Sequence, residues 1–220
     1  MNNSTCKFII GVCGLNASGK STVCHFFKDQ GYTVLSLSDI IRKTLSDRNI
    51  PENRDNLINM GNELRNKSGA GVLAMKTIDI LESNKNYVID SIRHPDEVKA
   101  FREMFLGANN NDNRKFYLIS ITSPPMARFN RIQSRNRIGD KVDYQQFMEI
   151  EKKEMNNPDP LGQQVARVME MSDFVIDNDP MKISSIDQLY KEISTLYHKS
   201  INKANSSTSS SSGSPLNSGN

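Results

Sequence analysis

Short apolar runs alternate along the chain with longer segments in which apolar residues recur at helical spacing. The runs cover residues 7–13, 33–37, 87–90, 116–122 and 174–177. Runs of this length predict strands, and strands that alternate with helices predict a parallel sheet covered by helices on both faces. A last amphipathic segment, whose apolar residues run from Ile183 to Leu196, predicts a closing helix. We therefore expect an α/β protein with a five-stranded parallel sheet in three α/β/α layers.

The composition limits the classes of protein to which the chain can belong. Its 220 residues carry a net charge of +3, which gives no reason to expect binding to nucleic acid or to a membrane surface. No apolar stretch approaches the roughly 20 residues that span a bilayer, and the first residues lack the pattern of a signal peptide. Three cysteines without a Cys-x-x-Cys spacing favour neither a disulfide framework nor a zinc site. We expect a soluble, cytoplasmic protein.

The chain is expected to hold one domain with two flanking segments. These are a flexible N-terminus at 1–6, a compact domain at 7–199 and a disordered tail at 200–220, whose serine and asparagine residues cannot bury enough apolar area to offset the entropy of ordering. Between the second and third predicted strands, residues 53–83 have the pattern of two helices joined by a flexible Ser-Gly-Ala-Gly turn at 68–71. Such a pair can form a hinged flap over an acceptor site or a plain crossover connection.

The segment after the first predicted strand carries the most specific pattern. Residues 14–21 read Gly-Leu-Asn-Ala-Ser-Gly-Lys-Ser, which fits G-x-x-x-x-G-K-[ST] between a strand and a helix. In such a phosphate-binding loop (P-loop) the backbone N–H groups surround the phosphates, the lysine reaches the β- and γ-phosphates, and the last hydroxyl binds Mg²⁺. We expect ATP and Mg²⁺ as cofactors. The residues expected around the nucleotide are Gly14, Asn16, Ala17, Ser18, Gly19, Lys20, Ser21 and Thr22.

The third predicted strand ends in an acidic residue that suits the same site. It reads Val-Ile-Asp as far as Asp90, and the chain continues through Arg93 to Pro95, where a helix is predicted to begin. Parallel strands end at a common edge of their sheet, and ligands bind in the crevice there. Because a carboxylate at that edge can orient Mg²⁺, Asp90 is expected beside Ser21 as a metal ligand and a catalytic residue. Arg93 lies in a loop that opens into the crevice.

After the second predicted strand, Ser38 and Asp39 precede Arg42 in a segment of helical periodicity. One interpretation is structural: Ser38 or Asp39 caps the helix, and Asp39 forms a surface ion pair with Arg42 three residues later. The other interpretation is an acceptor-binding helix on which Arg42 holds an anionic group. On the second interpretation, Ser38, Asp39, Arg42 and Arg93 bind the substrate.

Four arginines gather after the fourth predicted strand. Arg128, Arg131 and Arg135 recur at i, i+3 and i+7 and share one stripe of a predicted helix, and Arg137 follows at its end. A solvated basic face explains many such stripes. In a nucleotide-binding chain, however, guanidinium groups can stabilise the negative charge of a moving phosphoryl group. We therefore expect Arg131, Arg135 and Arg137 to be catalytic, beside a short lid loop at 135–143.

Four elements, taken in chain order, together resemble the nucleoside monophosphate kinases, the adenylate-kinase-like branch of the P-loop proteins, over about residues 7–199. They are the loop at 14–21, the Ser38-Asp39-x-x-Arg42 segment, the Asp90-x-x-Arg93 segment and the lid-like stretch from Arg128 to Arg137. The segments Leu-Ser-Asp-Ile-Ile-Arg and Val-Ile-Asp-Ser-Ile-Arg-His-Pro-Asp-Glu-Val are also similar to the P-loop region of some deoxycytidylate deaminases. The resemblance implies a P-loop NTPase fold in which Arg42 and Arg93 clamp an acceptor monophosphate and the lid arginines close on the transferring phosphate. The chain departs from adenylate kinases at Ser91-Ile92, where they have Gly-Phe-Pro-Arg. It also lacks the zinc motif of deaminases.

We expect an ATP-dependent kinase that transfers the γ-phosphoryl group in line to a small nucleotide-like monophosphate, with Lys20 as a catalytic residue. A phosphate acceptor is already ionised near neutral pH, so the reaction needs no base. Two alternatives remain open. One is a dephospho-CoA kinase, whose hydroxyl acceptor requires a base such as Asp39, and the other is a regulatory module that binds ATP without efficient transfer. The base and sugar of the acceptor and the oligomeric state also remain open.

Overall fold

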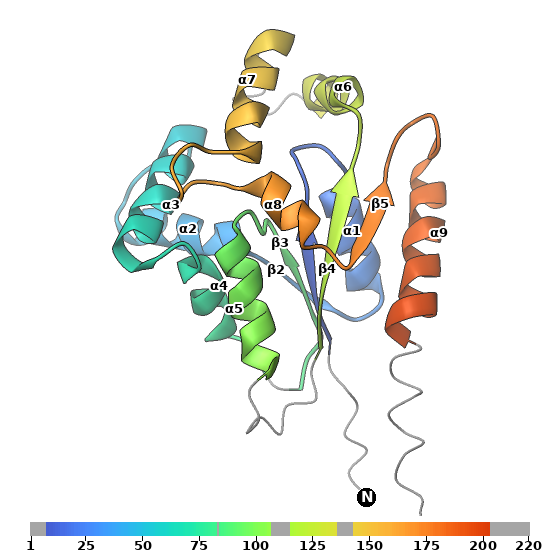
Figure 1. Cartoon of the computed structure of the whole chain (residues 1–220), viewed down its shortest axis with the longest axis horizontal. Coiled ribbons are helices and arrows are strands. Elements are labelled where there is room, and N and C mark those ends of the chain that lie inside the picture. The colour runs from blue at the N-terminus through green and yellow to red at the C-terminus, as the bar shows by residue number, and fades with distance from the viewer. Residues whose placement is uncertain (1–7, 83, 107–114, 136–142, 203–220) are drawn as a thin grey trace, which may run out of the picture.

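The computed structural model of the chain describes residues 8–82, 84–106, 115–135 and 143–202 (Figure 1). Within these residues, five strands form one parallel sheet in the order β2-β3-β1-β4-β5. The strands are β1 (Phe8–Cys13), β2 (Thr33–Ser36), β3 (Tyr87–Asp90), β4 (Lys115–Thr122) and β5 (Phe174–Asp177). The predicted α/β fold on five parallel strands is confirmed, and every strand lies within one residue of its predicted bounds.

Helices connect the strands and cover the sheet. They are α1 (Lys20–Asp29), α2 (Leu37–Asp47), α3 (Arg54–Ser68), α4 (Val72–Ile78), α5 (Pro95–Leu106), α6 (Pro125–Arg135), α7 (Tyr144–Met155), α8 (Val165–Glu170) and α9 (Ile186–Leu196), which a π-helical segment extends over Tyr197–Asn202. The closing helix and the two helices of the 53–83 segment are thus present as predicted. None of the helices in the described ranges has both the length and the apolar character that crossing a membrane requires.

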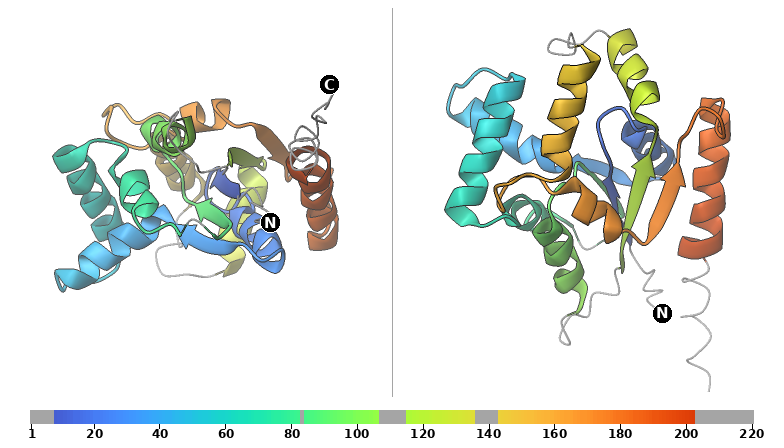
Figure 2. Two further views of the ribbon diagram at one scale, coloured as in Figure 1. Left: turned by 90° about the horizontal axis from the view of Figure 1, so that it is seen from below. Right: turned by 45° about the horizontal axis from the view of Figure 1, so that its top comes forward.

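The two faces of the sheet lie under different helices, which gives three layers (Figure 2). Neighbouring residues of β1 point to opposite faces: Ile9 joins the core beneath α4 and α5, whereas Ile10 joins the core beneath α1 and α9. All six residues of β1 are buried, because this strand lies between β3 and β4 and is covered on both sides. A strand in that position has no solvent-exposed face, which explains its uninterrupted apolar sequence.

The carboxyl ends of the strands meet at one edge of the sheet, and α6 and α7 stand above that edge (Figure 1). From β1 the chain passes through α1 to β2 on one side of the sheet, whereas from β4 it passes to β5 on the other side. Folds of this kind bind ligands in the crevice where the strand order reverses in this way. The P-loop, which follows β1, lies at that crevice.

Three predicted segments fall partly or wholly outside the described residues. They are the N-terminus at 1–6, the lid loop between Arg135 and Asp143 with its Arg137, and the tail beyond Asn202. The expectations for these segments stay predictions.

Candidate active site

The P-loop depends on two glycines. Gly14 has φ +139°, and a Cβ there would lie 2.3 Å from the carbonyl oxygen of Ile121. Gly19 has φ +116°, and a Cβ there would lie 2.6 Å from Asn178 Nδ2. Any other residue at either position would combine an unfavourable φ with a clash, so the tight curl of the loop requires glycine. The loop ends at the N-terminus of α1, where backbone N–H groups favour a bound phosphate.

The side chain of Lys20 reaches back to the first residues of this loop. Its Nζ donates hydrogen bonds to the carbonyl oxygens of Gly14 at 2.9 Å and Leu15 at 2.8 Å. Burial of the ammonium group, with repulsion from Arg93, lowers the pKa of Lys20 to about 8, although nearby carboxylates act in the opposite direction. No ion pair within the described part of the chain joins Lys20 to a carboxylate. The backbone carbonyls that bind Lys20 do not neutralise its charge, so this charge can pair with an anion bound in the P-loop.

Ser21 and Asp90 supply oxygen atoms beside the loop. Ser21 is exposed in the first turn of α1, and Asp90 is partly buried at the end of β3. Asp90 Oδ1 accepts a hydrogen bond of 2.6 Å from the N–H of Ser91, which has a left-handed φ of +67°. Such a conformation costs a non-glycine residue about 1 kcal/mol, and strained backbone of this kind clusters at functional sites. Hydroxyl and carboxylate oxygens are ligands that Mg²⁺ prefers, so these residue types fit the expected metal.

Arg131 of α6 contacts the P-loop directly. Its Nη1 donates hydrogen bonds to the Ala17 carbonyl oxygen at 3.1 Å and to Ser123 Oγ at 3.0 Å, and its Nη2 donates to the Asn178 carbonyl oxygen at 3.3 Å. Burial lowers the pKa of Arg131 below its usual value. One guanidinium group thus joins the P-loop to the ends of β4 and β5.

Asn178 is a second support of the loop that the sequence did not reveal. Its side chain is buried, and its Nδ2 donates a hydrogen bond of 2.8 Å to the Ser18 carbonyl oxygen. Its backbone N–H donates to the Thr122 carbonyl oxygen at 2.9 Å. In the sequence, Asn178 belongs to an Asn-Asp-Pro turn after β5, and the turn pattern alone does not indicate a contact with the P-loop.

Arg128 was expected to share one stripe of a helix with Arg131 and Arg135. It is buried, so it does not form an exposed basic face with them. Its buried guanidinium forms an ion pair with Glu151 of α7, donates through Nε to the Ser123 carbonyl oxygen at 2.8 Å, and lies over the ring of Phe147. The helical spacing correctly predicts α6, but it does not show that α7 covers this part of it. Arg128 therefore holds two helices together.

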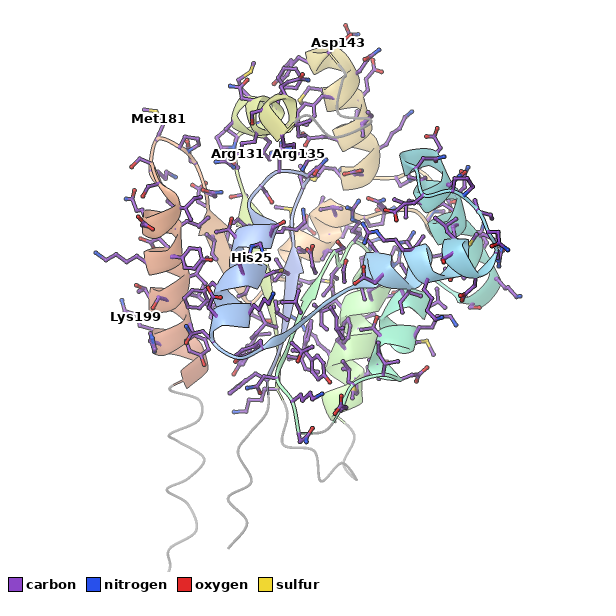
Figure 3. All side chains as sticks on the ribbon, turned by 180° about the vertical axis from the view of Figure 1, so that it is seen from behind. His25, Arg131, Arg135, Asp143, Met181 and Lys199 are labelled. Atoms are coloured by element: carbon purple, nitrogen blue, oxygen red, sulfur yellow. The ribbon has the colours of Figure 1, made fainter. Side chains whose placement is uncertain are left out.

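Arg135, at the end of α6, faces the P-loop as expected. Its Nη2 donates a hydrogen bond of 3.3 Å to Asn16 Oδ1. Figure 3 shows Arg131 and Arg135 extending from α6 toward the loop. Arg137, the third arginine predicted to be catalytic, lies outside the described residues. Two of the three expected arginines are thus at the P-loop, and their catalytic roles stay predictions.

A cavity of about 600 Å³ opens beside the P-loop, between α2, α3 and the β3–α5 loop. Its polar and basic wall consists of Asn16, Ser38, Arg42, Asn53, Arg65, Ser91, Arg93, Arg135 and Gln163. Its aliphatic wall consists of Leu37, Ile41, Leu57, Ile58 and Leu73, and its carboxylates are Glu52, Asp55 and Glu154. The cavity brings together a residue of the P-loop, one lid arginine and both arginines expected to bind an acceptor.

Two carboxylates hold Arg42 at the wall of this cavity. Arg42 Nη1 donates to Asp39 Oδ1 at 2.9 Å, and Nε donates to Glu52 Oε1 at 3.0 Å. Partial burial acts to lower the pKa of Arg42, but both carboxylates outweigh it and the pKa is raised. The N-cap of α2 is Ser36, whose Oγ accepts from the Ser38 N–H, so Ser38 is not the cap. Asp39 does contribute to the cap, because its Oδ2 accepts from the Ser36 N–H at 3.2 Å and completes a capping box. The predicted ion pair of Arg42 is present, but Asp39 does not line the cavity.

Arg93 lies in the β3–α5 loop and lines the same cavity. Its Nη1 donates a hydrogen bond of 3.0 Å to Gln163 Oε1 and lies 3.6 Å from Glu154 Oε1. Its backbone N–H donates to Glu97 Oε2 at 2.8 Å. Because α5 begins at Pro95, as predicted, Arg93 is in the loop and not in the helix.

Glu97 anchors the β3–α5 loop. From the sequence alone, Glu97 could be recognised only as an acidic residue in the first turn of a helix. Its fully buried carboxylate accepts from the backbone N–H groups of Arg93 and His94, and it pairs with Arg65 of α3 at 3.4 Å. His94, which the sequence gave no role, is also buried, and its Nε2 lies 2.9 Å from the Pro160 carbonyl oxygen. Buried groups from several elements therefore fix the position of Arg93.

The chain matches the family model described as AAA domain, AAA_18, over residues 10–159. It is 33% identical over 175 residues to the UPF0200 protein of Pyrococcus horikoshii, a match that covers 78% of this chain and 88% of that protein. The chain is thus an AAA-domain protein of the UPF0200 family. The UPF0200 protein of Pyrococcus abyssi is 30% identical to it over 195 residues, which cover 87% of this chain and 96% of the relative.

This UPF0200 protein has the fold of the P-loop kinases. Shikimate kinase from Bacteroides thetaiotaomicron superposes on it with a TM-score of 0.54 and 11% sequence identity, covering 87% of this chain and 97% of that chain. TT1252 from Thermus thermophilus gives a TM-score of 0.52 at 18% identity, covering 89% of this chain and 99% of that chain. Identities this low indicate a shared fold and leave the substrate open. The predicted likeness to P-loop kinases is confirmed at the level of the fold.

Proposed function

We propose that this protein is an ATP-dependent phosphotransferase that acts on a small nucleotide-like monophosphate. The observation that carries the proposal is the single cavity that joins Asn16 of the P-loop to Arg42, Arg93 and Arg135. A phosphotransferase needs the donor phosphate and the acceptor to meet in one space, and here these three arginines line one cavity with a residue of the donor loop. The fourth arginine of the cavity wall, Arg65, is paired with Glu97. Guanidinium groups are well suited to bind phosphate because their N–H donors match two phosphate oxygens at once.

The residues that line the cavity support an acceptor with one anionic end and one apolar end. Arg135, which is bonded to Asn16, and Arg93, whose charge acts on Lys20, lie on the P-loop side of the cavity. Aliphatic side chains of α2, α3 and α4 also line the cavity, among them Ile41, Leu57 and Leu73. Binding sites for organic ligands combine apolar walls with a few polar groups that fix the orientation. A phosphate joined to a ring system such as a nucleoside fits this arrangement better than a small polyol does.

Catalysis in such a site consists of positioning and charge neutralisation. The phosphate acceptor is already ionised near neutral pH, so no residue has to remove a proton from it. Lys20 lies at the donor loop, and Arg93 and Arg135 lie at the cavity, where they can balance the charge that spreads over the moving phosphoryl group. When bound, Mg²⁺ would add positive charge beside Ser21 and Asp90.

A hydroxyl acceptor, as in a dephospho-CoA kinase, is the second candidate because the cavity also contains a carboxylate that could serve as a base. Glu154 lines the cavity and lies near Arg93. Asp39, the base expected from the sequence, is bonded to Arg42 and is not part of the cavity wall. If the acceptor is a hydroxyl, Glu154 is therefore a better base than Asp39.

The test is a coupled assay of ADP release with purified protein, ATP and Mg²⁺, across ribonucleoside and deoxyribonucleoside monophosphates and dephospho-CoA. We expect at least one monophosphate to stimulate ADP release well above the rate with ATP alone. Stimulation by dephospho-CoA alone would favour the hydroxyl acceptor. Tight ATP binding without stimulation by any acceptor would instead indicate a regulatory module. The Arg93→Met variant should lower acceptor-dependent turnover about a hundredfold, since removal of one group that stabilises a transition-state charge costs about this much.

A further inference from the structure

The side-chain contacts that the described residues make with the guanidinium group of Arg93 are all at one nitrogen, Nη1. Nη1 donates a hydrogen bond of 3.0 Å to Gln163 Oε1 and lies 3.6 Å from Glu154 Oε1. Among the described residues, no hydrogen bond or ion pair involves Nε or Nη2 of Arg93. The side chain is 28% exposed and lines the cavity, so these two N–H donors remain for a ligand. Nε and Nη2 form the side-on fork that binds two oxygens of one oxyanion.

Gln163 belongs to the α7–α8 loop (residues 156–164), which is also bonded to the backbone of Arg93. The N–H of Gln164 donates a hydrogen bond of 2.8 Å to the Arg93 carbonyl oxygen. The N–H of Asn157 donates to the Gln163 carbonyl oxygen at 3.2 Å. The same loop therefore holds Arg93 by its main chain and by its side chain.

The α7–α8 loop has little freedom to shift. Gln164 Nε2 donates to the Asn157 carbonyl oxygen at 2.7 Å, so the two ends of the loop are joined. A Cβ at Gly162 would lie 2.4 Å from Asn157 Cγ, which shows how closely the loop folds on itself. The buried His94 lies 2.9 Å from the Pro160 carbonyl oxygen and ties the loop to the segment that carries Arg93. A side chain from such a loop can fix a rotamer of Arg93.

We propose that Gln163 is a positioning residue, which occupies Nη1 of Arg93 and thereby presents the Nε and Nη2 edge to the terminal phosphate of the acceptor. The proposal rests on the proposed function, in which Arg93 binds that phosphate. An arginine side chain that is already held in one rotamer loses less conformational entropy when it binds a ligand than a freely rotating one does. Glu154, a carboxylate near the same nitrogen, repels an oxyanion from the Nη1 edge and so favours the other.

A double-mutant cycle tests this inference. The variants are Gln163→Leu, Arg93→Met and the double variant, and the measurement is equilibrium binding of the best monophosphate from the assay panel in the absence of ATP. We expect Gln163→Leu to weaken acceptor binding about tenfold, which corresponds to the loss of one hydrogen bond to a charged group. ATP binding should change less than about twofold. In the Arg93→Met background, Gln163→Leu should have almost no further effect, because its role acts through Arg93.

Three further measurements make the outcome decisive. Gln145→Leu, an exposed change on α7, is the matched control and should leave acceptor binding unchanged. Gln163→Glu, which keeps an oxygen for Arg93, covers the case in which Gln163→Leu does not fold; its added negative charge should weaken phosphate binding. Inorganic phosphate is the probe if no monophosphate binds. Equal effects of Gln163→Leu in both backgrounds, no effect at all, or a parallel loss of ATP binding would overturn the proposal.

The same data separate this inference from the proposed function. Coupling between Gln163 and Arg93 in phosphate binding, with no ADP release from any acceptor, would support the positioning role and contradict the kinase. Acceptor-dependent ADP release without coupling would support the kinase and contradict the positioning role.

Discussion

The Asn178 side chain donates a hydrogen bond of 2.8 Å to the Ser18 carbonyl oxygen and so joins the end of β5 to the P-loop. We predict that Asn178→Ala lowers the free energy of unfolding by about 1–2 kcal/mol, because a buried carbonyl loses its partner. ATP binding should weaken about tenfold, since the loop loses a fixed support. Thermal unfolding and ATP titration measure the two effects. The matched control is Asn130→Ala on the exposed face of α6, which should alter neither.

Gly19 and Gly31 both have a positive φ but differ in the space around them. A Cβ at Gly19 would lie 2.6 Å from Asn178 Nδ2, whereas a Cβ at Gly31 would meet nothing within 4 Å. Gly31→Ala should therefore cost about 1 kcal/mol of stability from the backbone conformation alone and leave ATP binding intact. Gly19→Ala should weaken ATP binding about a hundredfold, because the loop and Asn178 cannot both keep their positions. Equal ATP affinities of the two variants would show that the packing around Gly19 is unimportant.

The lowered pKa of Lys20 predicts how ATP affinity depends on pH. In the free protein Lys20 titrates at about 8, and the negative charge of a bound triphosphate should raise the pKa of this ammonium group. Affinity should therefore be constant below pH 8 and should fall above it, by up to about tenfold per pH unit, until the pH reaches the pKa of the complex. ATP titrations in a pH series test this. Lys20→Met should bind weakly with no such decline, and a wild-type affinity that rises above pH 8 would contradict the account.

Glu97 is predicted to matter for stability and for the acceptor side of the site. Replacement of Glu97 by Ala leaves Arg65 as an unpaired buried charge and removes the acceptor of two backbone N–H groups. The expected loss is about 3 kcal/mol in the free energy of unfolding, measured by denaturation in urea. The KM for the acceptor should rise more than the KM for ATP, because the Arg93 loop loses its anchor. Glu103→Ala, an exposed change on α5, is the control for both measurements.

The sheet and the P-loop could be predicted because their signals are local in the sequence. A central parallel strand is apolar at every position, so β1 was recognisable without its neighbours. Gly14, Gly19 and Lys20 stand at the fixed spacing that a phosphate-binding loop requires. The placement of Asp90 at a strand end and the start of α5 at Pro95 followed from the same kind of local pattern.

The contacts that hold the site together could not be predicted, because they join residues distant in the sequence. Asn178 reaches Ser18 across 160 positions, and Arg93 reaches Gln163 across 70. Helical spacing placed Arg128 in α6, but only the packing of α7 shows that its guanidinium is buried. These contacts depend on how helices lie over the carboxyl edge of the sheet, which no single segment of the sequence encodes.

The central claim is that the P-loop and the neighbouring cavity form the donor and acceptor halves of one phosphotransferase site. The most direct test follows the labelled γ-phosphate of ATP in the presence of the best monophosphate acceptor, for the wild type and for Lys20→Ala. The account predicts that the wild type transfers the label to the acceptor and that Lys20→Ala, although folded, transfers almost none. Label that stays on ATP in the wild type with every acceptor, or transfer that persists in Lys20→Ala, would contradict it.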